Sequence, residues 1–246
     1  MSGESNFTLD DQLVPFQDGQ TIMGAARAAG VYIPHLCFNP DFAPHGSCRV
    51  CLVKVNGRTQ ASCTTPAVAG QVVQSGTEEL REIRQGILEM MFVEGNHICP
   101  ACEKSGACQL QAVAYYVGML APLFTYFYPR RAIDASHPDA IIDFDRCILC
   151  ELCVRASRDF DGKNVFAVQN RGLKAHLVIN TPSGKLGATD FSITDKAAQV
   201  CPTGAILIKN RGYETPIGWR LYDRQAVNVV GDVAQAPESE GGLRHE

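Results

Sequence analysis

The number and spacing of the cysteines constrain this chain more than any other sequence feature. The 246 residues include 11 cysteines, and an odd number cannot pair completely in disulfides within one chain. Two residues separate the members of four cysteine pairs, at 48/51, 99/102, 147/150 and 150/153, whereas random placement would give roughly 0.5 such pairs. Two thiols at this spacing can reach one metal centre from a tight loop, so the pattern predicts metal binding.

Composition and charge exclude several classes of protein. A hydrophobic fraction of 46% and a net charge of −4 are typical of a globular protein and provide no basic footprint for nucleic acid. The first residues lack the basic and apolar segments of a secretory signal. We therefore expect a cytoplasmic chain whose thiols stay reduced.

An uncharged segment covers residues 105–129. Its apolar part, 112–128, is shorter than the roughly 20 residues that a membrane span needs, and it contains Pro122. We expect no membrane span here. Aromatic residues concentrate at the cores of interfaces, so the segment predicts either a partner-binding surface or internal core. Its six aromatic residues are Tyr115, Tyr116, Phe124, Tyr126, Phe127 and Tyr128.

Turn signals and apolar periodicity predict the secondary structure. In the first part of the chain we expect a helix over 21–29 that Gly30 closes, and a hairpin turn at Asn56-Gly57. Further helices are predicted over 77–93 and 108–118. The predicted strands cover 7–9, 13–16, 50–55, 58–63, 71–74, 141–144, 166–170 and 176–180. The buried face of the 77–93 helix is predicted to carry Leu80, Ile83, Ile87 and Met91.

The first set of candidate ligands has 10, 2 and 11 residues between its four cysteines. Four thiolates are the ligand number of a 2Fe–2S cluster, and a loop rich in Pro and Gly can direct its amides towards the sulfurs. Zinc is the alternative metal. The set consists of Cys37, Cys48, Cys51 and Cys63. Nearby, His35 and His45 are expected to be solvent-exposed or to support the ligands rather than to ligate.

The third set is the most specific pattern. Three cysteines at two-residue spacing and a distant Cys-Pro are the pattern that binds a 4Fe–4S cluster in bacterial ferredoxins. The position of the further cysteine that serves a second cluster in those proteins is Ser157 here. This set therefore predicts one 4Fe–4S cluster. It consists of Cys147, Cys150, Cys153 and Cys201.

The second set has only three cysteines, Cys99, Cys102 and Cys108. A 4Fe–4S cluster needs a fourth ligand, and His97 is the nearest candidate, ahead of Glu94 and Glu103. A neutral imidazole in place of a thiolate makes a cluster less negative and raises its potential.

Together these motifs resemble the iron–sulfur module at the N-terminus of the large peripheral subunit of respiratory complex I, over about residues 7–212. Similar modules occur in iron-only hydrogenases, NAD-dependent formate dehydrogenases and NAD-reducing hydrogenases. The resemblance rests on the 10-2 spacing in the first set, the segment 94–111 and the third set with its Cys-Pro. In that family one His and three Cys hold the middle cluster, with two and five residues between the cysteines, and this sequence keeps that spacing.

The position of the histidine restricts the resemblance to one branch of this family. The common form of the family has three residues between the His and the first Cys, which here corresponds to Gly95, a residue that cannot ligate. One residue separates His97 from Cys99, and this short form looks like the diaphorase iron–sulfur (gamma) subunit of NAD-reducing nickel–iron hydrogenases. The chain also ends soon after its last cysteine, whereas the complex I and formate dehydrogenase versions continue into a large further domain.

The resemblance implies an α+β chain with four parts. These are a β-grasp 2Fe–2S ferredoxin-like domain over 1–76, a helical His(Cys)3 4Fe–4S domain over 77–134, a bacterial-ferredoxin-like 4Fe–4S domain over 135–212, and a C-terminal extension over 213–246 with a flexible end. It implies one 2Fe–2S and two 4Fe–4S clusters and no substrate site.

The implied role is electron relay within an oxidoreductase complex. The expected partners are an FMN- and NAD-binding diaphorase subunit and the small and large subunits of a nickel–iron hydrogenase, which would hold the FMN, NAD and Ni–Fe groups. The same relay could serve a formate dehydrogenase or an NADH dehydrogenase. A zinc-binding scaffold protein is the alternative of another class, but it does not explain the third set.

Overall fold

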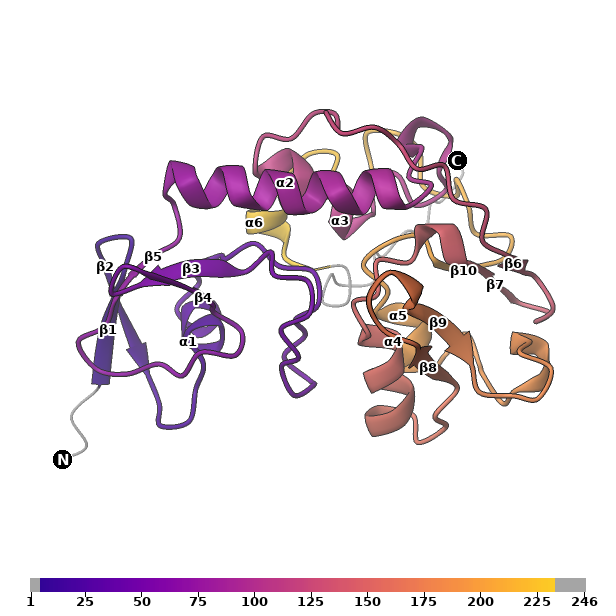
Figure 1. Cartoon of the computed structure of the whole chain (residues 1–246), viewed down its shortest axis with the longest axis horizontal. Helices are drawn as coiled ribbons and strands as arrows, with labels where there is room; N and C mark the ends of the chain where they lie inside the picture. Colours follow the sequence, from indigo (N-terminus) through magenta and orange to yellow (C-terminus); the bar gives the residue numbers. More distant parts are fainter. Residues whose placement is uncertain (1–4, 233–246) are drawn as a thin grey trace, which may run out of the picture.

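The structure is a computed structural model that describes residues 5–232. The predicted flexible end, from about residue 230 onwards, lies almost wholly outside the described residues. In Figure 1 a sheet lies at one end of the molecule, a smaller α+β unit lies at the other end, and one long helix extends along the top between them. No helix among residues 5–232 is long and apolar enough to span a membrane.

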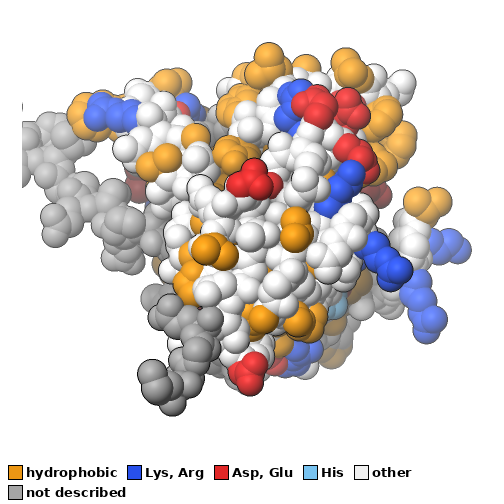
Figure 2. Space-filling view, turned by 90° about the vertical axis from the view of Figure 1, so that its left-hand side faces the viewer, with side chains coloured by type: hydrophobic (Ala, Val, Ile, Leu, Met, Phe, Trp, Pro, Cys, Tyr) orange, Lys and Arg blue, Asp and Glu red, His pale blue; other side chains and the backbone are white. Residues whose placement is uncertain are grey.

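The first unit is a five-stranded mixed sheet in the order β2-β1-β5-β3-β4. The predicted hairpin at Asn56-Gly57 is confirmed, because β3 pairs with β4 across it, and the predicted strands 7–9 and 13–16 form a second hairpin in which β1 pairs with β2. The central β5 runs parallel to β1 and antiparallel to β3. The strands are β1 (Ser5–Leu9), β2 (Gln12–Phe16), β3 (Leu52–Val55), β4 (Arg58–Ala61) and β5 (Val72–Gln74). Figure 2 looks onto this end of the molecule, where hydrophobic side chains are scattered singly or in small groups.

Helix α1 (Ile22–Ala28) closes the first core. The Thr21 side chain accepts a hydrogen bond from the Gly24 amide and caps the first turn. Gly30 follows with φ +74°, the left-handed conformation that commonly ends a helix. Ile22, Met23, Ala25 and Ala26 are buried against the sheet, so the predicted helix and its end are confirmed.

Helix α2 (Glu78–Glu94) confirms the predicted helix but corrects its buried face. Of the four predicted residues only Leu80 is fully buried, whereas Ile83, Ile87 and Met91 are half-buried. The buried row instead has a spacing of four residues: Leu80, Arg84, Leu88 and Phe92. The sequence prediction assigned only apolar residues to the buried face, so it did not include a charged residue in this row. Arg84 can occupy it because four hydrogen bonds satisfy its guanidinium group.

The second core joins α2, α3 and the third unit. Helix α3 (Gln109–Tyr116) begins directly after Cys108 and buries Leu110 to Ala114. The aromatic segment beyond it stays outside this core: Leu123 is 88% exposed, Phe127 71% and Tyr128 74%. The first part of the predicted segment, up to Met119, therefore contributes to the internal core, whereas the part from Leu120 to Tyr128 is mostly exposed.

The third unit has two small sheets. One has the order β10-β7-β6 and the other pairs β8 with β9. These strands are β6 (Ile133–Asp134), β7 (Ala140–Asp143), β8 (Phe166–Gln169), β9 (His176–Ile179) and β10 (Ile206–Ile208). The helices of this unit are α4 (Leu152–Arg155), which continues as a π-helical turn over Ala156–Phe160, and α5 (Lys196–Gln199). Helix α6 (Val227–Val230) lies beneath α2 and packs against α3 instead (Figure 1).

Candidate metal centres

The first set lies on the loops that connect α1 to β3 and follow β4. All four cysteines are buried. The Cys48 amide donates to the Cys37 sulfur at 3.4 Å, and the sulfurs of Cys51 and Cys63 lie 3.4 Å apart. Thiol contacts run from Cys48 through Cys37 and Cys63 to Cys51, so the four sulfurs form one compact group. Four thiolates are the ligand number of a two-iron core.

The protonation of these thiols supports ligation. Hydrogen bonds from neighbouring thiols lower the pKa of Cys37 and Cys51, while the same hydrogen bonds raise the pKa of Cys48 and Cys63. Cys37 and Cys51 therefore give up their protons more readily than Cys48 and Cys63, and the thiolate is the form that binds metal.

The second set surrounds one cavity. His97, Cys99, Cys102 and Cys108 all line it, and neither of the alternative ligands, Glu94 and Glu103, does so. Glu94 is exposed, and Glu103 forms an ion pair with Arg146 at 2.7 Å. Cys99 starts a short 3-10 helix (Cys99–Ala101), and Cys108 is the residue before α3.

The His97 ring has the properties of a ligand. Its Nε2 atom is buried and has no hydrogen-bond partner among the described residues, and an unsatisfied buried nitrogen is expensive unless it binds something. Burial, together with the charges of Arg146 and Arg131, lowers the pKa of His97 to about 4. The imidazole is therefore neutral at pH 7, as ligation requires.

Gly95, the position at which the common spacing would place a histidine, makes room for this ring. A Cβ atom at Gly95 would lie 2.6 Å from both Cδ2 and Nε2 of His97. Because no ordinary contact is this short, the ring can occupy its place only beside a glycine.

The third set also surrounds one cavity. Cys147, Cys150, Cys153 and Cys201 all line it, together with apolar side chains such as Leu177 and Ile206. Leu149 and Glu151 have φ of +52° and +59°, and these left-handed residues turn the loop after Cys147 and Cys150. Burial raises the pKa of Cys147 to about 11 and also raises the pKa of Cys150 and Cys153. Such a thiol loses its proton when a metal cation binds to the sulfur in place of the proton.

Ser157 takes a structural role in place of a further ligand. Its side chain is 1% exposed, and its hydroxyl accepts a hydrogen bond from the Val165 amide at 2.8 Å. The serine thus joins the π-helical turn to the start of β8, and its oxygen is already engaged.

The second and third sets meet at the Cys-Pro segment. The Cys108 thiol and the Leu110 amide both point to the Pro202 carbonyl oxygen, at 3.6 and 3.2 Å. Gly204 lines the cavity of the second set, and a Cβ there would lie 3.5 Å from the Cys102 sulfur. Residues 201–204 therefore separate the two cavities by only a few atoms.

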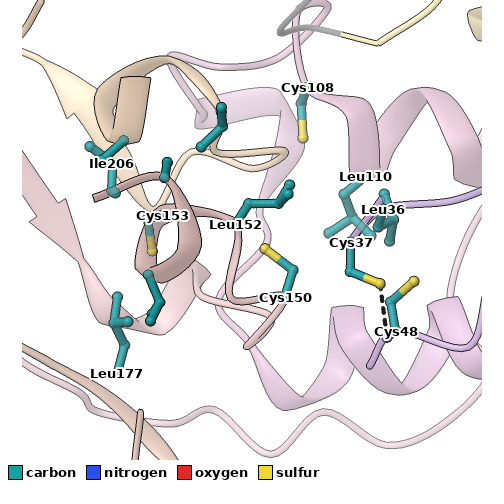
Figure 3. Close-up of a cluster of buried hydrophobic side chains, with 14 of the residues drawn as sticks. Leu36, Cys37, Cys48, Cys108, Leu110, Cys150, Leu152, Cys153, Leu177 and Ile206 are labelled. Carbon is teal, nitrogen blue, oxygen red and sulfur yellow. Dashed lines mark hydrogen bonds between the residues drawn. The ribbon is translucent and has the colours of Figure 1, made fainter. Parts of the chain in front are cut away.

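The first and third sets approach each other through the second core. Figure 3 shows Cys150 between Cys153 on one side and Cys37 and Cys48 on the other, with Leu152 and Leu110 packed among them. The charge of Cys37 is one of the causes that raise the pKa of Cys150. All three sets thus contribute cysteines to the second core, while Cys51 and Cys63 of the first set belong to the first core.

The spacing of the ligands distinguishes zinc from iron–sulfur clusters. Three cysteines at two-residue spacing with a distant Cys-Pro, as in the third set, are the pattern of a 4Fe–4S cluster, whereas structural zinc usually takes two separated pairs. Across residues 5–232, no three His, Cys, Asp or Glu side chains meet at the point that one metal ion would occupy.

Two other histidines clarify the surroundings of the first set. His35 is buried, which excludes the solvent-exposed alternative for this residue, and its ring nitrogens bond to the Ile33 carbonyl and the Asp232 carboxylate at 2.7 and 3.0 Å. His45 is hydrogen-bonded to Glu151 at 3.1 Å. The partner of His35 lies 197 residues away, so no local sequence signal could reveal its burial.

Sequence reasoning also missed three arginines near the sets: Arg84, Arg146 and Arg155. Arg146 and Arg155 directly flank the third set in sequence, but the sequence does not show the direction of their side chains. Arg146 pairs with Glu103 and Asp143 beside the second set. Arg84 and Arg155 both reach the backbone around the first set.

Comparisons with known families match the three parts of the chain. Residues 4–78 match the 2Fe-2S iron-sulfur cluster binding domain, residues 84–122 match the NADH-ubiquinone oxidoreductase-G iron-sulfur binding region, and residues 141–208 match the 4Fe-4S single cluster domain. Both kinds of binding domain are therefore present, and the ferredoxin-like α+β fold class is confirmed.

Individual relatives extend the match to nearly the whole chain. The NAD-reducing hydrogenase HoxS subunit gamma of Cupriavidus necator is 40% identical over 90% of this chain and 94% of its own length. The NADPH-Fe(3+) oxidoreductase subunit alpha of Geobacter sulfurreducens is 35% identical over 83% of this chain but only 24% of its own length.

A solved structure of an NAD+-reducing [NiFe]-hydrogenase in the H2-reduced state contains a chain with the same fold. Its TM-score is 0.91 at 50% identity, and the match covers 96% of this chain and 100% of that one. With three candidate sites in the expected order and relatives that match end to end, the chain belongs to the family of iron–sulfur subunits that includes the gamma subunit of NAD-reducing hydrogenase.

Proposed function

We propose that this chain is the electron-relay subunit of an NAD-reducing nickel–iron hydrogenase. In this role it carries electrons from a hydrogenase module, where H2 is oxidised, to an FMN-containing diaphorase subunit that reduces NAD+. The proposal rests on one geometric observation above all: three sets of thiol ligands, one completed by an orphaned imidazole, lie in or beside the second core, where the first set borders the first core.

The proposed ligands are the residues predicted from the sequence. Cys37, Cys48, Cys51 and Cys63 would hold one 2Fe–2S cluster. His97, Cys99, Cys102 and Cys108 would hold one 4Fe–4S cluster, and Cys147, Cys150, Cys153 and Cys201 a second. When bound, such clusters supply sites for one-electron transfer. The proposed domain boundaries are those given by the sequence, although the pairing of β6 with β7 joins Ile133 and Asp134 to the third unit.

The chain itself contributes exclusion of water and fixed geometry. Cys37, Cys51 and Cys63 are each 1% exposed, so water has little access to the first set. A dry site with rigid ligands needs little reorganisation when its charge changes by one electron. Residues 201–204 hold the second and third sets close together, because Cys108 and Leu110 both contact Pro202.

The exposed aromatic segment fits a role in assembly. Leu120 and Leu123 are 85% and 88% exposed, and Phe127 and Tyr128 lie on the same segment. Contiguous exposed apolar side chains of this kind mark surfaces that bind partners. The proposed partners are the diaphorase subunit and the small and large hydrogenase subunits, in the cytoplasm.

Metal and sulfide analysis tests the proposal. The anaerobically purified complex should contain roughly ten iron atoms per copy of this chain after subtraction of the partner subunits' clusters. Dithionite reduction of the separately expressed chain should produce EPR signals of three clusters. Zinc without acid-labile sulfide would refute the relay and support a scaffold protein.

The identity of co-purifying subunits tests the second half of the proposal. A nickel-containing subunit and a flavin-containing subunit are expected. Co-purification with a formate dehydrogenase subunit, or with membrane-bound quinone-reducing subunits and no nickel, would leave the relay in place but assign it to a different complex.

A further inference from the structure

Arg155 links the third set to the loop of the first set. It is the last residue of α4, two positions after Cys153, and it is 4% exposed. Its guanidinium donates to the Cys37 carbonyl oxygen at 2.5 Å and to the Ala43 carbonyl oxygen at 2.8 Å. The Phe42 ring lies 5.8 Å from the guanidinium carbon. One side chain thus connects the backbones of two candidate metal sites.

The positive charge of Arg155 has no carboxylate partner. All of its hydrogen-bond acceptors are carbonyl oxygens, and it takes part in none of the ion pairs found within residues 5–232. A buried cation without an anion is costly. Two residues that would become anionic on metal binding flank these contacts: Cys37, whose carbonyl oxygen accepts a hydrogen bond from Arg155, and Cys153, which lies two positions before it in α4.

Arg84 is a second buried arginine at the first set, and its contacts differ from those of Arg155. It comes from α2, is also 4% exposed, and donates to the carbonyl oxygens of Val50 and Leu52, at 3.1 and 2.6 Å. Its remaining hydrogen bonds go to Ser75. Arg84 therefore holds the part of the first set around Cys51, and none of its hydrogen bonds reaches the third set.

We propose that Arg155 is a positioning residue that fixes the first set against the third and whose permanent positive charge raises the reduction potentials of the clusters at both sets. Reduction adds one negative charge to a cluster. A guanidinium in the same apolar interior stabilises that charge more strongly than water would. Net charge and hydrogen bonds are the main determinants of iron–sulfur potentials. The inference rests on the proposed function, since it requires that these sets hold clusters.

Three substitutions separate the charge from the contacts. Arg155→Lys keeps the charge, Arg155→Gln keeps a hydrogen-bond donor without the charge, and Arg155→Met keeps only the packing volume. Arg84→Met is the matched control, because it removes a guanidinium of equal burial from the first set alone. Each variant is made in the full complex, and the clusters of this chain are titrated with redox mediators and followed by EPR.

Loss of the charge should lower the potentials of two clusters and spare one. In Arg155→Gln and Arg155→Met, the equilibrium constant for one-electron reduction of the first and third clusters should fall about tenfold, which corresponds to 59 mV. The second cluster should shift by less than about twofold. Arg155→Lys should stay within about threefold of the unchanged protein at all three, and Arg84→Met should shift only the first cluster.

Several results would overturn the inference. These are unchanged potentials in Arg155→Gln, an equal shift of all three clusters, or a shift in Arg155→Lys as large as that in Arg155→Gln. If Arg155→Met does not retain full iron, the comparison of Arg155→Lys with Arg155→Gln decides the question. If Arg155→Gln also loses iron while Arg155→Lys does not, the identity of the lost cluster decides. Loss of the first or third cluster alone supports the inference, and loss of the second overturns it. The iron and sulfide content of the unsubstituted chain distinguishes failure of the proposed function from failure of the role of Arg155. Absence of iron and sulfide refutes the proposed function. Full content with no shift in potential refutes only the role of Arg155.

Discussion

The substitution Gly95→Ala tests whether the His97 ring lies where the structure places it. An added Cβ would lie 2.6 Å from Cδ2 and Nε2 of His97 and 2.8 Å from the Asp145 carbonyl oxygen. Ordinary contacts begin at 3.4 Å, so the ring must move by about 0.8 Å. The Asp145 carbonyl oxygen must also give way, and its hydrogen bond from the Asn96 amide at 2.9 Å resists that shift.

The expected effect on metal binding follows from this displacement. Metal–ligand distances tolerate changes of about 0.2 Å, so a shift of about 0.8 Å removes the imidazole from a ligand position. The strain adds a cost of about 1–3 kcal/mol to folding. Gly95→Ala should therefore lose or alter the EPR signal of the second cluster, and iron should fall from about ten towards about six per chain. The signals of the other two clusters should remain.

Gly86→Ala is the matched control within the same helix. A Cβ at Gly86 meets nothing within 4 Å, and alanine is preferred to glycine inside a helix by about 0.5–1 kcal/mol. Gly86→Ala should keep all three signals and raise the melting temperature by roughly 2 °C. Full iron and an unaltered second signal in Gly95→Ala would show that the ring does not pack on Gly95 and would refute the reasoning.

Three further predictions concern other contacts. His97→Ala should alter or abolish the EPR signal of the second cluster and spare the other two, and three unchanged signals would exclude His97 as a ligand. His97→Cys adds a negative charge and should therefore lower the reduction potential of the second cluster. Ser157→Ala removes the acceptor of the buried Val165 amide and should cost about 1–3 kcal/mol in urea unfolding with no change in iron, whereas loss of a cluster would contradict its structural role. The hydrogen bonds of Arg220 lower the pKa of Asp223 to about 2, so this contact stabilises the fold above the ordinary aspartate pKa of about 3.9 and is lost as the pH falls towards about 2. Asp223→Asn at pH 7 should therefore speed exchange of the Gly218 amide, which donates to this carboxylate at 2.7 Å, and unchanged exchange would contradict it.

The middle of the chain shows why the aromatic segment could not be assigned from sequence. Apolar composition predicts burial, but it does not say whether the covering surface belongs to the same chain. The structure buries Leu110 and Val113 in α3 and leaves Leu120, Leu123 and Phe127 exposed. An exposed apolar segment of this kind is a property of the whole fold, because only tertiary packing determines which residues remain uncovered.

The sequence by itself predicted the candidate ligand sets and determined most of the helices and strands. Cysteine spacing is a local property, and so are the Asn56-Gly57 hairpin and the Gly30 helix end, since neighbouring residues decide each of them. Even the missing twelfth ligand followed from an odd count of cysteines, which directed attention to His97.

Only the tertiary structure decided how these sets are coupled. The burial of Arg84 in α2, the contact of Arg155 with the Cys37 carbonyl, and the bond of His35 to Asp232 join residues that are 34, 118 and 197 positions apart. A charged residue can be buried only where distant acceptors meet it, and no local pattern encodes where those acceptors lie. The physical reason is that ligand spacing depends on the local chain, whereas the electrostatic environment of a metal site depends on everything packed around it.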